Sequence, residues 1–338
     1  MDEPIVRQQE VISYADLLRR QIDPPRPLVE GVLDAGCGAI LAGPPNVGKT
    51  WLVLSLARAV AAGYPWLGRF PTVQAPVVLF DEEGHLPGAQ ARCQMLEAAD
   101  ALTSPPPVYF CVGHGVRLDT QDGVSHLEHI IRRYRPGLTI LDSLTRVHGA
   151  DENDAGGMAA VFAVAKTLMR TYGTAFLFTD HLRKKSLIND PEEMLRGSTE
   201  KRAWPDAILF AAPGDGTQVR ITHVKSRYGR RLDPFGVELA IDEAAGTAKL
   251  SYAGAVTSDA VTKGNEIVAA IQDLKTQLGE DGADATAVAA WLDCGPDTVR
   301  RHVAKLVEAG ILTRRKVAPS SRGGPPKQVF DVVGGHER

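Results

Sequence analysis

Long apolar runs are missing from this chain, and so are paired cysteines. The most apolar stretch, residues 51–67, is interrupted by an arginine, a glycine and a proline and is too short to span a bilayer. The four cysteines are widely spaced with no C-x-x-C pair, which excludes a disulfide scaffold and a zinc finger. The N-terminus lacks the basic and apolar regions of a signal peptide. We therefore expect a cytoplasmic protein with no membrane partner.

No charge of one sign dominates, and aromatic residues are few. The chain has 38 Lys and Arg against 41 Asp and Glu, so no global field steers it toward nucleic acid or lipid, and any basic surface must be local. Aromatic residues, 6% of the chain, leave little material for the stacking platforms that bind single strands. The remainder is an ordinary globular mixture, and 338 residues suffice for two or three domains.

Apolar runs typical of buried strands alternate with helical patterns over the first 250 residues. The runs occupy residues 39–42, 76–80, 107–111, 138–142, 174–179, 207–211 and 219–224. The helical patterns occupy residues 51–62, 123–134 and 158–172. This alternation predicts an α/β fold with a mostly parallel central sheet that helices cover on both faces.

Composition divides the chain into four parts. Residues 1–35 are predicted to be an extended N-terminal arm, and residues 36–252 carry the alternating pattern. Residues 253–264 are small, polar and aperiodic, which indicates a linker. In residues 265–338, three amphipathic helices (267–278, 285–292, 296–309) precede two strands (311–317, 328–333). That order is typical of a small winged helix-turn-helix domain.

The segment Gly43–Thr50 fits the phosphate-loop pattern G-x-x-x-x-G-K-[ST] and lies between a short apolar strand and a helix. Its glycines let the backbone N–H groups face phosphates, and the helix N-terminus adds partial positive charge. We expect Lys49 to reach the β- and γ-phosphates of ATP and the Thr50 hydroxyl to hold Mg²⁺. The predicted ATP-binding residues are Gly43, Pro44, Pro45, Asn46, Val47, Gly48, Lys49, Thr50 and Trp51.

Carboxylates at two other strand ends complete the predicted chemistry. Asp142 ends the run 138–142, where a second group that holds the metal is expected. Glu82 and Glu83 follow the run 76–80, at the sheet edge where α/β proteins bind ligands. Since ATP hydrolysis needs a group that orients or deprotonates the attacking water, one of these two glutamates is the predicted catalytic base.

Three further segments extend the pattern: Phe178–Lys184, Arg196-Gly197-Ser198 and Lys225-Ser226-Arg227. With them, roughly residues 20–250 resemble the RecA-like P-loop ATPases of the plasmid RepA type, relatives of hexameric replicative helicases. The resemblance implies an ATP-hydrolysing DNA motor that acts in replication or mobile-element maintenance. It also implies a homo-oligomer, a ring or filament, with single-stranded DNA in its channel.

The resemblance assigns roles to individual residues. Family members have a strand that ends in Glu, with an Arg nine residues later; Glu83 and Arg92 have this spacing and Glu82 does not. Glu83 is therefore the expected catalytic base, with Glu82 in reserve. His181 matches the second of the family's paired histidines, the γ-phosphate sensor, while Asp180 replaces the first.

Two candidates exist for a cation that reaches the neighbouring subunit's γ-phosphate. Lys225 and Arg227 lie two residues apart on a strand, so their side chains point the same way, and they resemble the paired cations of RecA-type rings. Arg196 is the competing candidate. Residues 151–154 resemble a loop that faces the channel or a neighbour, although an exposed acidic loop is an equally good interpretation.

The C-terminal segment is locally basic. Residues 296–338 hold nine Lys or Arg and four acids, a net charge of +5, which leaves −8 for the rest of the chain. Helix 296–309 resembles the recognition helix of winged-helix regulators, which predicts a partner in duplex DNA; a protein partner is the alternative. The predicted DNA contacts are Thr298, Arg300, Arg301, Lys305, Arg322 and Lys327.

Two other functions fit part of this pattern. An ATP-switched DNA-binding regulator or recombination mediator would use the same residues without separating strands. The low aromatic content favours this alternative slightly. A small-molecule kinase would explain the phosphate loop but not the winged helix.

Overall fold

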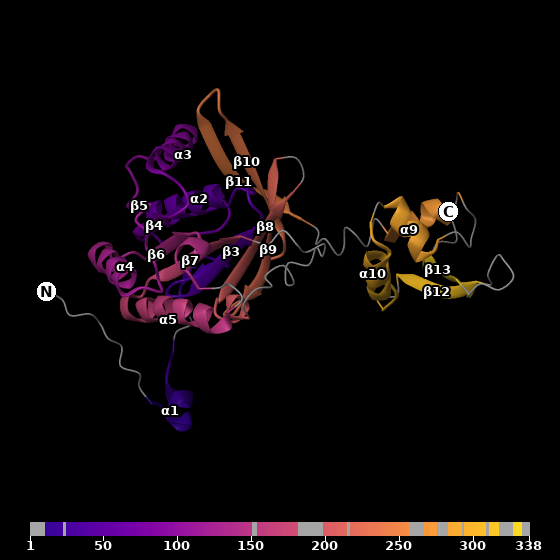
Figure 1. Cartoon of the computed structure of the whole chain (residues 1–338), viewed down its shortest axis with the longest axis horizontal. Helices are drawn as coiled ribbons and strands as arrows, with labels where there is room; N and C mark the ends of the chain where they lie inside the picture. Colours follow the sequence, from indigo (N-terminus) through magenta and orange to yellow (C-terminus); the bar gives the residue numbers. More distant parts are fainter. Residues whose placement is uncertain are drawn as a thin grey trace. The chain divides into compact units, whose positions relative to one another are not determined.

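The chain forms two compact units, residues 1–256 and 257–338, and each is described here by itself (Figure 1). In the first unit, the computed structural model describes residues 11–22, 25–150, 154–181, 199–214 and 217–256. In the second, it describes residues 267–268, 270–275, 277, 283–292, 294–308, 311–317 and 327–332. No helix in these ranges is long and apolar enough to cross a bilayer.

A nine-stranded sheet organises the first unit (Figure 1). Its strands lie in the order β11-β10-β9-β8-β3-β7-β6-β4-β5, and the last six in this order run parallel to one another. The strands are β3 (Gly38–Gly43), β4 (Val77–Asp81), β5 (Val108–Val112), β6 (Leu138–Asp142), β7 (Ala175–His181), β8 (Ala207–Pro213), β9 (Gln218–Ser226), β10 (Phe235–Asp242) and β11 (Thr247–Ala255). The predicted α/β fold with a mostly parallel sheet is confirmed.

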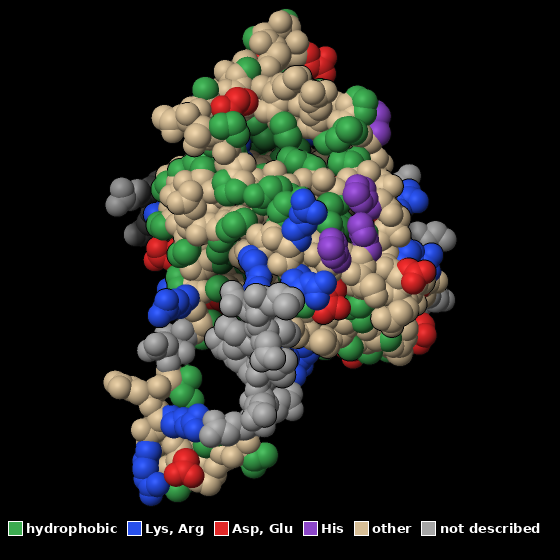
Figure 2. Space-filling view, turned by 90° about the vertical axis from the view of Figure 1, so that its left-hand side faces the viewer, with side chains coloured by type: hydrophobic (Ala, Val, Ile, Leu, Met, Phe, Trp, Pro, Cys, Tyr) green, Lys and Arg blue, Asp and Glu red, His purple; other side chains and the backbone are tan. Residues whose placement is uncertain are grey.

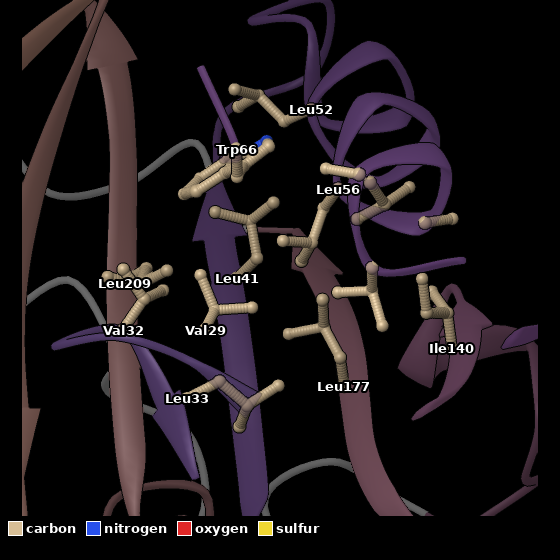
Figure 3. Close-up of a cluster of buried hydrophobic side chains, with 14 of the residues drawn as sticks. Val29, Val32, Leu33, Leu41, Leu52, Leu56, Trp66, Ile140, Leu177 and Leu209 are labelled. Atoms are coloured by element: carbon tan, nitrogen blue, oxygen red, sulfur yellow. The ribbon is translucent and has the colours of Figure 1, made fainter. Parts of the chain in front are cut away.

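Helices cover both faces of the sheet. The helices α2 (Lys49–Ala62) and α3 (Leu86–Ala99) lie on one face, and α4 (Gln121–Tyr134) and α5 (Ala155–Tyr172) lie on the other (Figure 1). Strand side chains alternate between the faces, so Leu177 packs with α2 whereas Phe176 and Phe178 pack with α5. Figure 3 shows part of the buried cluster on the α2 side of the sheet, which includes Leu41 of β3, Leu177 of β7, and Leu52 and Leu56 of α2.

Part of the predicted N-terminal arm belongs to the core. The strands β1 (Pro27–Val29) and β2 (Leu33–Asp34) pair antiparallel, and Val29, Val32 and Leu33 are buried in the cluster of Figure 3. The short helix α1 (Tyr14–Arg19), by contrast, buries none of its side chains. At the other end of the unit, β11 continues to Ala255, three residues into the predicted linker.

The second unit has its own apolar core. Residues 270–275 are helical and are followed by α9 (Ala285–Trp291), α10 (Pro296–Glu308) and the antiparallel hairpin of β12 (Leu312–Val317) and β13 (Lys327–Val332). Ile271, Val288, Val299, Val303 and Phe330 are buried together. Three helical segments and a two-stranded hairpin thus occur in the order that the sequence predicts.

Candidate active site

The phosphate loop joins β3 to α2, and its backbone requires glycine at one position. Gly48 precedes α2 with φ of 92°, a left-handed conformation that residues other than glycine rarely adopt. A Cβ at this position would also lie 3.0 Å from a methyl group of Leu239 in β10. The first turn of α2 leaves backbone N–H groups without helical partners, and this is the arrangement that binds phosphate.

Lys49 is buried at the start of α2 and folds back over the loop. Its Nζ donates hydrogen bonds of 2.9 Å to the carbonyl oxygens of Gly43 and Pro44 and lies 3.2 Å from His181 Nδ1. Because an ammonium group only donates, His181 Nδ1 accepts this bond and the ring proton resides on Nε2. Burial lowers the pKa of Lys49, and nearby carboxylates act in the opposite direction.

Glu83 continues this chain of hydrogen bonds. His181 Nε2 donates to Glu83 Oε1 over 3.0 Å, and the Ser143 hydroxyl donates to the same oxygen. Burial acts to raise the pKa of Glu83, but the bonds from Ser143 and His181 outweigh it, so the pKa lies below its ordinary value. Glu83 is therefore an ionised acceptor at neutral pH, held in place by two side chains.

Thr50 and Asp142 present oxygen atoms side by side. The Thr50 hydroxyl donates to Asp142 Oδ2 over 3.0 Å, and the Thr179 hydroxyl donates to the other carboxylate oxygen. Asp142 is buried, which raises its pKa despite these two bonds. Magnesium prefers oxygen ligands, and a buried carboxylate next to a hydroxyl at the edge of a phosphate loop fits that ion.

A hollow of about 460 Å³ lies over these groups. It is lined by Pro45, Asn46, Gly48, Lys49, Thr50, Trp51, Glu83, Arg92, Asp142 and His181. Six of the nine predicted ATP-binding residues line it. Of the other three, Gly43 and Val47 are buried, and the carbonyl oxygens of Gly43 and Pro44 accept hydrogen bonds from the Lys49 ammonium group. In the sequence, Arg92 is distinguished only by its spacing from Glu83. In the structure, it lines the hollow from α3.

Glu82, the reserve candidate for the base, is occupied elsewhere and does not line the hollow. Its two carboxylate oxygens accept the backbone N–H groups of Gly115 (2.9 Å) and Val116 (3.2 Å). The carboxylate therefore anchors the segment that follows β5. Its position therefore favours Glu83 over Glu82 as the candidate base.

Asp180 faces away from the hollow, to the opposite side of the sheet from Thr179 and His181. It forms a buried ion pair with Lys201 of α7 (Glu200–Ala203), with an Nζ to Oδ2 distance of 2.9 Å. Its Oδ1 accepts the backbone N–H of His181 over 2.9 Å. The sequence does not reveal this pair, because Lys201 is 21 positions away in the chain.

Lys225 and Arg227 share one acceptor, so their side chains lie on the same side of the sheet, as predicted. Lys225 Nζ and Arg227 Nη2 donate to the carbonyl oxygen of Ala203 over 2.9 and 3.0 Å, and Arg227 also pairs with Asp206. In the sheet, Lys225 pairs with Ile208 near the start of β8, at the end opposite the phosphate loop. Arg196 and residues 151–153 lie outside the described residues.

Histidine side chains gather on the side of the first unit that Figure 2 shows. His114 Nδ1 and His126 Nε2 lie 3.3 Å apart. Among the described residues, no group of three or more His, Cys, Asp or Glu side chains can hold a metal ion.

The predicted DNA contacts of the second unit differ in their surroundings. Arg300 pairs with Asp297 over 2.6 Å, and Lys327 lies 3.4 Å from Asp284. Thr298 is partly buried and Arg301 is exposed on α10, whereas the side chain of Lys305 and all of Arg322 lie outside the described residues. Two exposed cations on β12, Arg314 and Lys316, were not among the predicted contacts. Their only sequence signal is their alternation along the strand.

The parallel sheet, the phosphate loop after β3 and the acid at the end of β6 are the features of a RecA-like P-loop fold. The family described as the AAA domain matches residues 3–186, and the chain belongs to that family. The fold is similar to that of a solved DnaB-like replicative helicase, described with its interactions with primase, at a TM-score of 0.50 and 14% identity. The match covers 63% of this chain and 57% of that protein.

Proposed function

We propose that the chain is an ATP-hydrolysing DNA motor of the RepA type, with the second unit as a winged-helix DNA-binding domain. The observation that carries the proposal is the continuous chain Lys49–His181–Glu83–Ser143 across the hollow, next to the Thr50–Asp142 pair. These groups offer a phosphate cation, a sensor, a base and oxygen donors for a metal in one hollow.

ATP would bind with its phosphates over the first turn of α2. Lys49 would exchange its bonds to two loop carbonyls and His181 for bonds to the β- and γ-phosphates, which are stronger acceptors because they are charged. Thr50 and Asp142 would hold Mg²⁺, which neutralises charge on the phosphates when it is bound. Trp51 and Arg92, which line the same hollow, would border the rest of the nucleotide.

Glu83 would act on the attacking water. Its lowered pKa keeps it ionised, and Ser143 and His181 hold it from two directions. A γ-phosphate accepts hydrogen bonds, so His181 would contact it only as a donor, with a proton on Nδ1 in place of the bond from Lys49. Glu83 would then take a proton from a water that attacks this phosphate.

Lys225 and Arg227 do not line this hollow, because they lie at the opposite end of the strands. A strand of six residues such as β3 spans about 20 Å, and Lys225 and Arg227 lie at the opposite end from Lys49. They cannot reach their own subunit's γ-phosphate across that distance. We therefore propose that they serve a neighbouring copy in a ring or filament of identical subunits.

The second unit would supply contacts to duplex DNA. Its hairpin follows the α10 helix as a wing follows a recognition helix, and its exposed cations Arg301, Arg314 and Lys316 would contact phosphates. The similar solved protein is a replicative helicase by its description, and this agrees with action on DNA. That this chain unwinds DNA and acts in replication is part of our proposal.

A regulator or recombination mediator that uses ATP as a switch is the second candidate. The observation that favours it is the scarcity of aromatic side chains, which limits base stacking in a channel. The two candidates differ in the nucleic acid that should stimulate hydrolysis.

Mg·ATP hydrolysis measured alone, with single-stranded DNA and with duplex DNA tests the proposal. Stimulation by single strands in the wild type and its absence in Lys49→Ala support the motor. Stimulation by duplex alone, lost in Arg301→Ala/Arg314→Ala, supports the switch. Equal inactivity of wild type and Lys49→Ala under all three conditions would overturn both. A matched control is Lys166→Ala, an exposed cation on α5 outside the hollow.

A further inference from the structure

A buried ion pair lies next to the ATP site, on the opposite face of the sheet. The side chains of Asp180 and Lys201 are 3% and 5% exposed, and the Asp180 carboxylate also accepts the N–H of His181. His181, on the other face of β7, contacts both Lys49 and Glu83. One carboxylate therefore connects the histidine of the ATP hollow with helix α7.

The C-terminal end of α7 binds Lys225 and Arg227, the two cations that we propose act in the neighbouring subunit's ATP site. The carbonyl oxygen of Arg202 accepts Lys225 Nζ over 2.8 Å, and that of Ala203 accepts both Lys225 and Arg227. The last carbonyls of a helix have no helical partners, so cations bind them favourably. The positions of Lys225 and Arg227 thus depend on the position of this short helix.

The segment around α7 is packed against the core of the first unit. Trp204 stacks on Phe162 of α5 with ring centroids 4.5 Å apart and meets Phe178 of β7 edge-on. Just beyond it, Asp206 accepts the N–H of Gly38 and pairs with Arg227. Residues 200–206 therefore connect the carboxyl edge of β7 with the amino edge of β3, and close-packed elements of this kind move together.

We infer that α7 couples the ATP site of each subunit to the cations, Lys225 and Arg227, that the same subunit presents to its neighbour, with Asp180–Lys201 as the connection. The inference rests on the proposed role of these two cations in the neighbouring site. A γ-phosphate that draws Lys49 away from His181 changes the contacts of His181, whose backbone Asp180 holds. ATP in one subunit would thereby adjust the cations offered to the next, and neighbouring sites would respond to ATP cooperatively.

Hydrogen exchange on the wild-type protein tests the connection without any substitution. The amides of Ala203 and Trp204, which donate to Thr199 and Glu200, report on the integrity of α7. Saturation with a non-hydrolysable ATP analogue and Mg²⁺ should change their protection. Unchanged protection under saturation would overturn the inference.

The double variant Asp180→Asn/Lys201→Gln removes both charges of the pair together, so that neither is left buried without the other. It should bind a fluorescent ATP analogue as the wild type does, and the analogue should no longer alter protection of Ala203 and Trp204. The ATP dependence of hydrolysis should have a Hill coefficient above 1 in the wild type and about 1 in the variant. A wild type without cooperativity, or a variant as cooperative as the wild type, contradicts the coupling.

Two controls separate this inference from the proposal beneath it. Lys275→Gln/Asp331→Asn removes another Lys–Asp pair, in the second unit, and should leave cooperativity unchanged. Lys225→Ala/Arg227→Ala should abolish hydrolysis while ATP binding persists. If that variant remains active, the neighbour-site proposal fails and the coupling fails with it. If it is inactive while Asp180→Asn/Lys201→Gln behaves as wild type, the coupling alone fails.

Discussion

Glu82 and Glu83 are adjacent in the chain, yet their carboxylates serve different parts of the molecule. Glu83 accepts hydrogen bonds from Ser143 and His181 at the ATP hollow, whereas Glu82 accepts hydrogen bonds from the backbone N–H groups of residues 115 and 116. This difference separates a candidate for catalysis from an anchor of the fold, although both residues have the same side chain.

Glu83→Gln should retain ATP binding and lose hydrolysis. Removal of a general base lowers kcat by about 10²–10⁴-fold. Steady-state hydrolysis and titration with a fluorescent ATP analogue measure the two properties separately. Glu82→Gln is the matched control: it should keep kcat within a few-fold and lower the free energy of unfolding by about 1–3 kcal/mol. A larger kcat loss in Glu82→Gln than in Glu83→Gln would reverse the assignment.

Lys49→Met should bind ATP weakly, because it removes the ammonium group that faces the phosphates. We expect a loss of affinity of about 1.5–3 kcal/mol, the usual contribution of a hydrogen bond to a charged group. The fluorescent analogue again provides the measurement, with Lys166→Met as the control. Unfolding monitored in parallel should show a stable protein, since the buried cation loses its desolvation cost along with its hydrogen bonds.

Two inactive variants should restore activity when mixed. Lys49→Met cannot bind ATP well but retains Lys225 and Arg227, while Lys225→Ala/Arg227→Ala binds ATP but offers no cations. In mixed assemblies, some hydrolysis sites combine an intact hollow with intact cations. Titration of one variant into the other should give a maximum of ATPase activity at intermediate ratios. A flat, inactive mixture would show that the cations do not act between subunits.

The stability of the second unit should fall in acid through Asp331. Burial acts to raise its pKa, but ion pairs with Lys275 and Arg315 outweigh it, and the pKa of Asp331 is lower than normal. A lowered pKa in the folded state means that the stabilisation is complete above the ordinary value of about 3.9 and is lost as pH falls through the lowered one. Denaturant unfolding from pH 7 to pH 2 should show a shallower decline for Asp331→Asn than for the wild type.

Gly38→Ala should destabilise the first unit. A Cβ at Gly38 would lie 2.4 Å from the ring of Trp204, so the ring or the strand must move. Overpacking of this kind costs about 1–3 kcal/mol. Gly156→Ala in α5 is the control, because the nearest atom to its Cβ lies at 3.4 Å. Thermal unfolding of both variants gives the comparison, and equal melting temperatures would contradict the contact.

The elements that the sequence predicts are those with local signals. The strands β3 and β6 are continuous apolar runs because both of their faces are buried. The phosphate loop follows a fixed sequence pattern. Helix α3 was missed because only Ala89 and Leu96 of its residues are fully buried, which leaves no apolar stripe to detect. The β10–β11 hairpin was missed because it is half exposed and lacks the apolar runs of the parallel strands.

The site shows the same division. Lys49, Thr50, Asp142, Glu83 and His181 follow strand ends or a known spacing, so the sequence alone predicts each of them. Three features depended on tertiary contacts: the Asp180–Lys201 pair, the anchoring by Glu82 and the place of Arg92 in the hollow. Lys201 and Asp180 come together only because α7 crosses the face of the sheet that carries α5.

The location of the hollow and of Lys225 and Arg227 at opposite ends of one sheet restricts the symmetry of any assembly that joins them. A two-fold dimer presents the same patch of both subunits to each other, so it can bring one subunit's hollow to the other's cations only where one patch contains both. Head-to-tail contacts can do so, and they leave an open row with one complete site fewer than its subunits. Closure of such a row into a circle completes every site, so activity per subunit would itself record whether the row has closed.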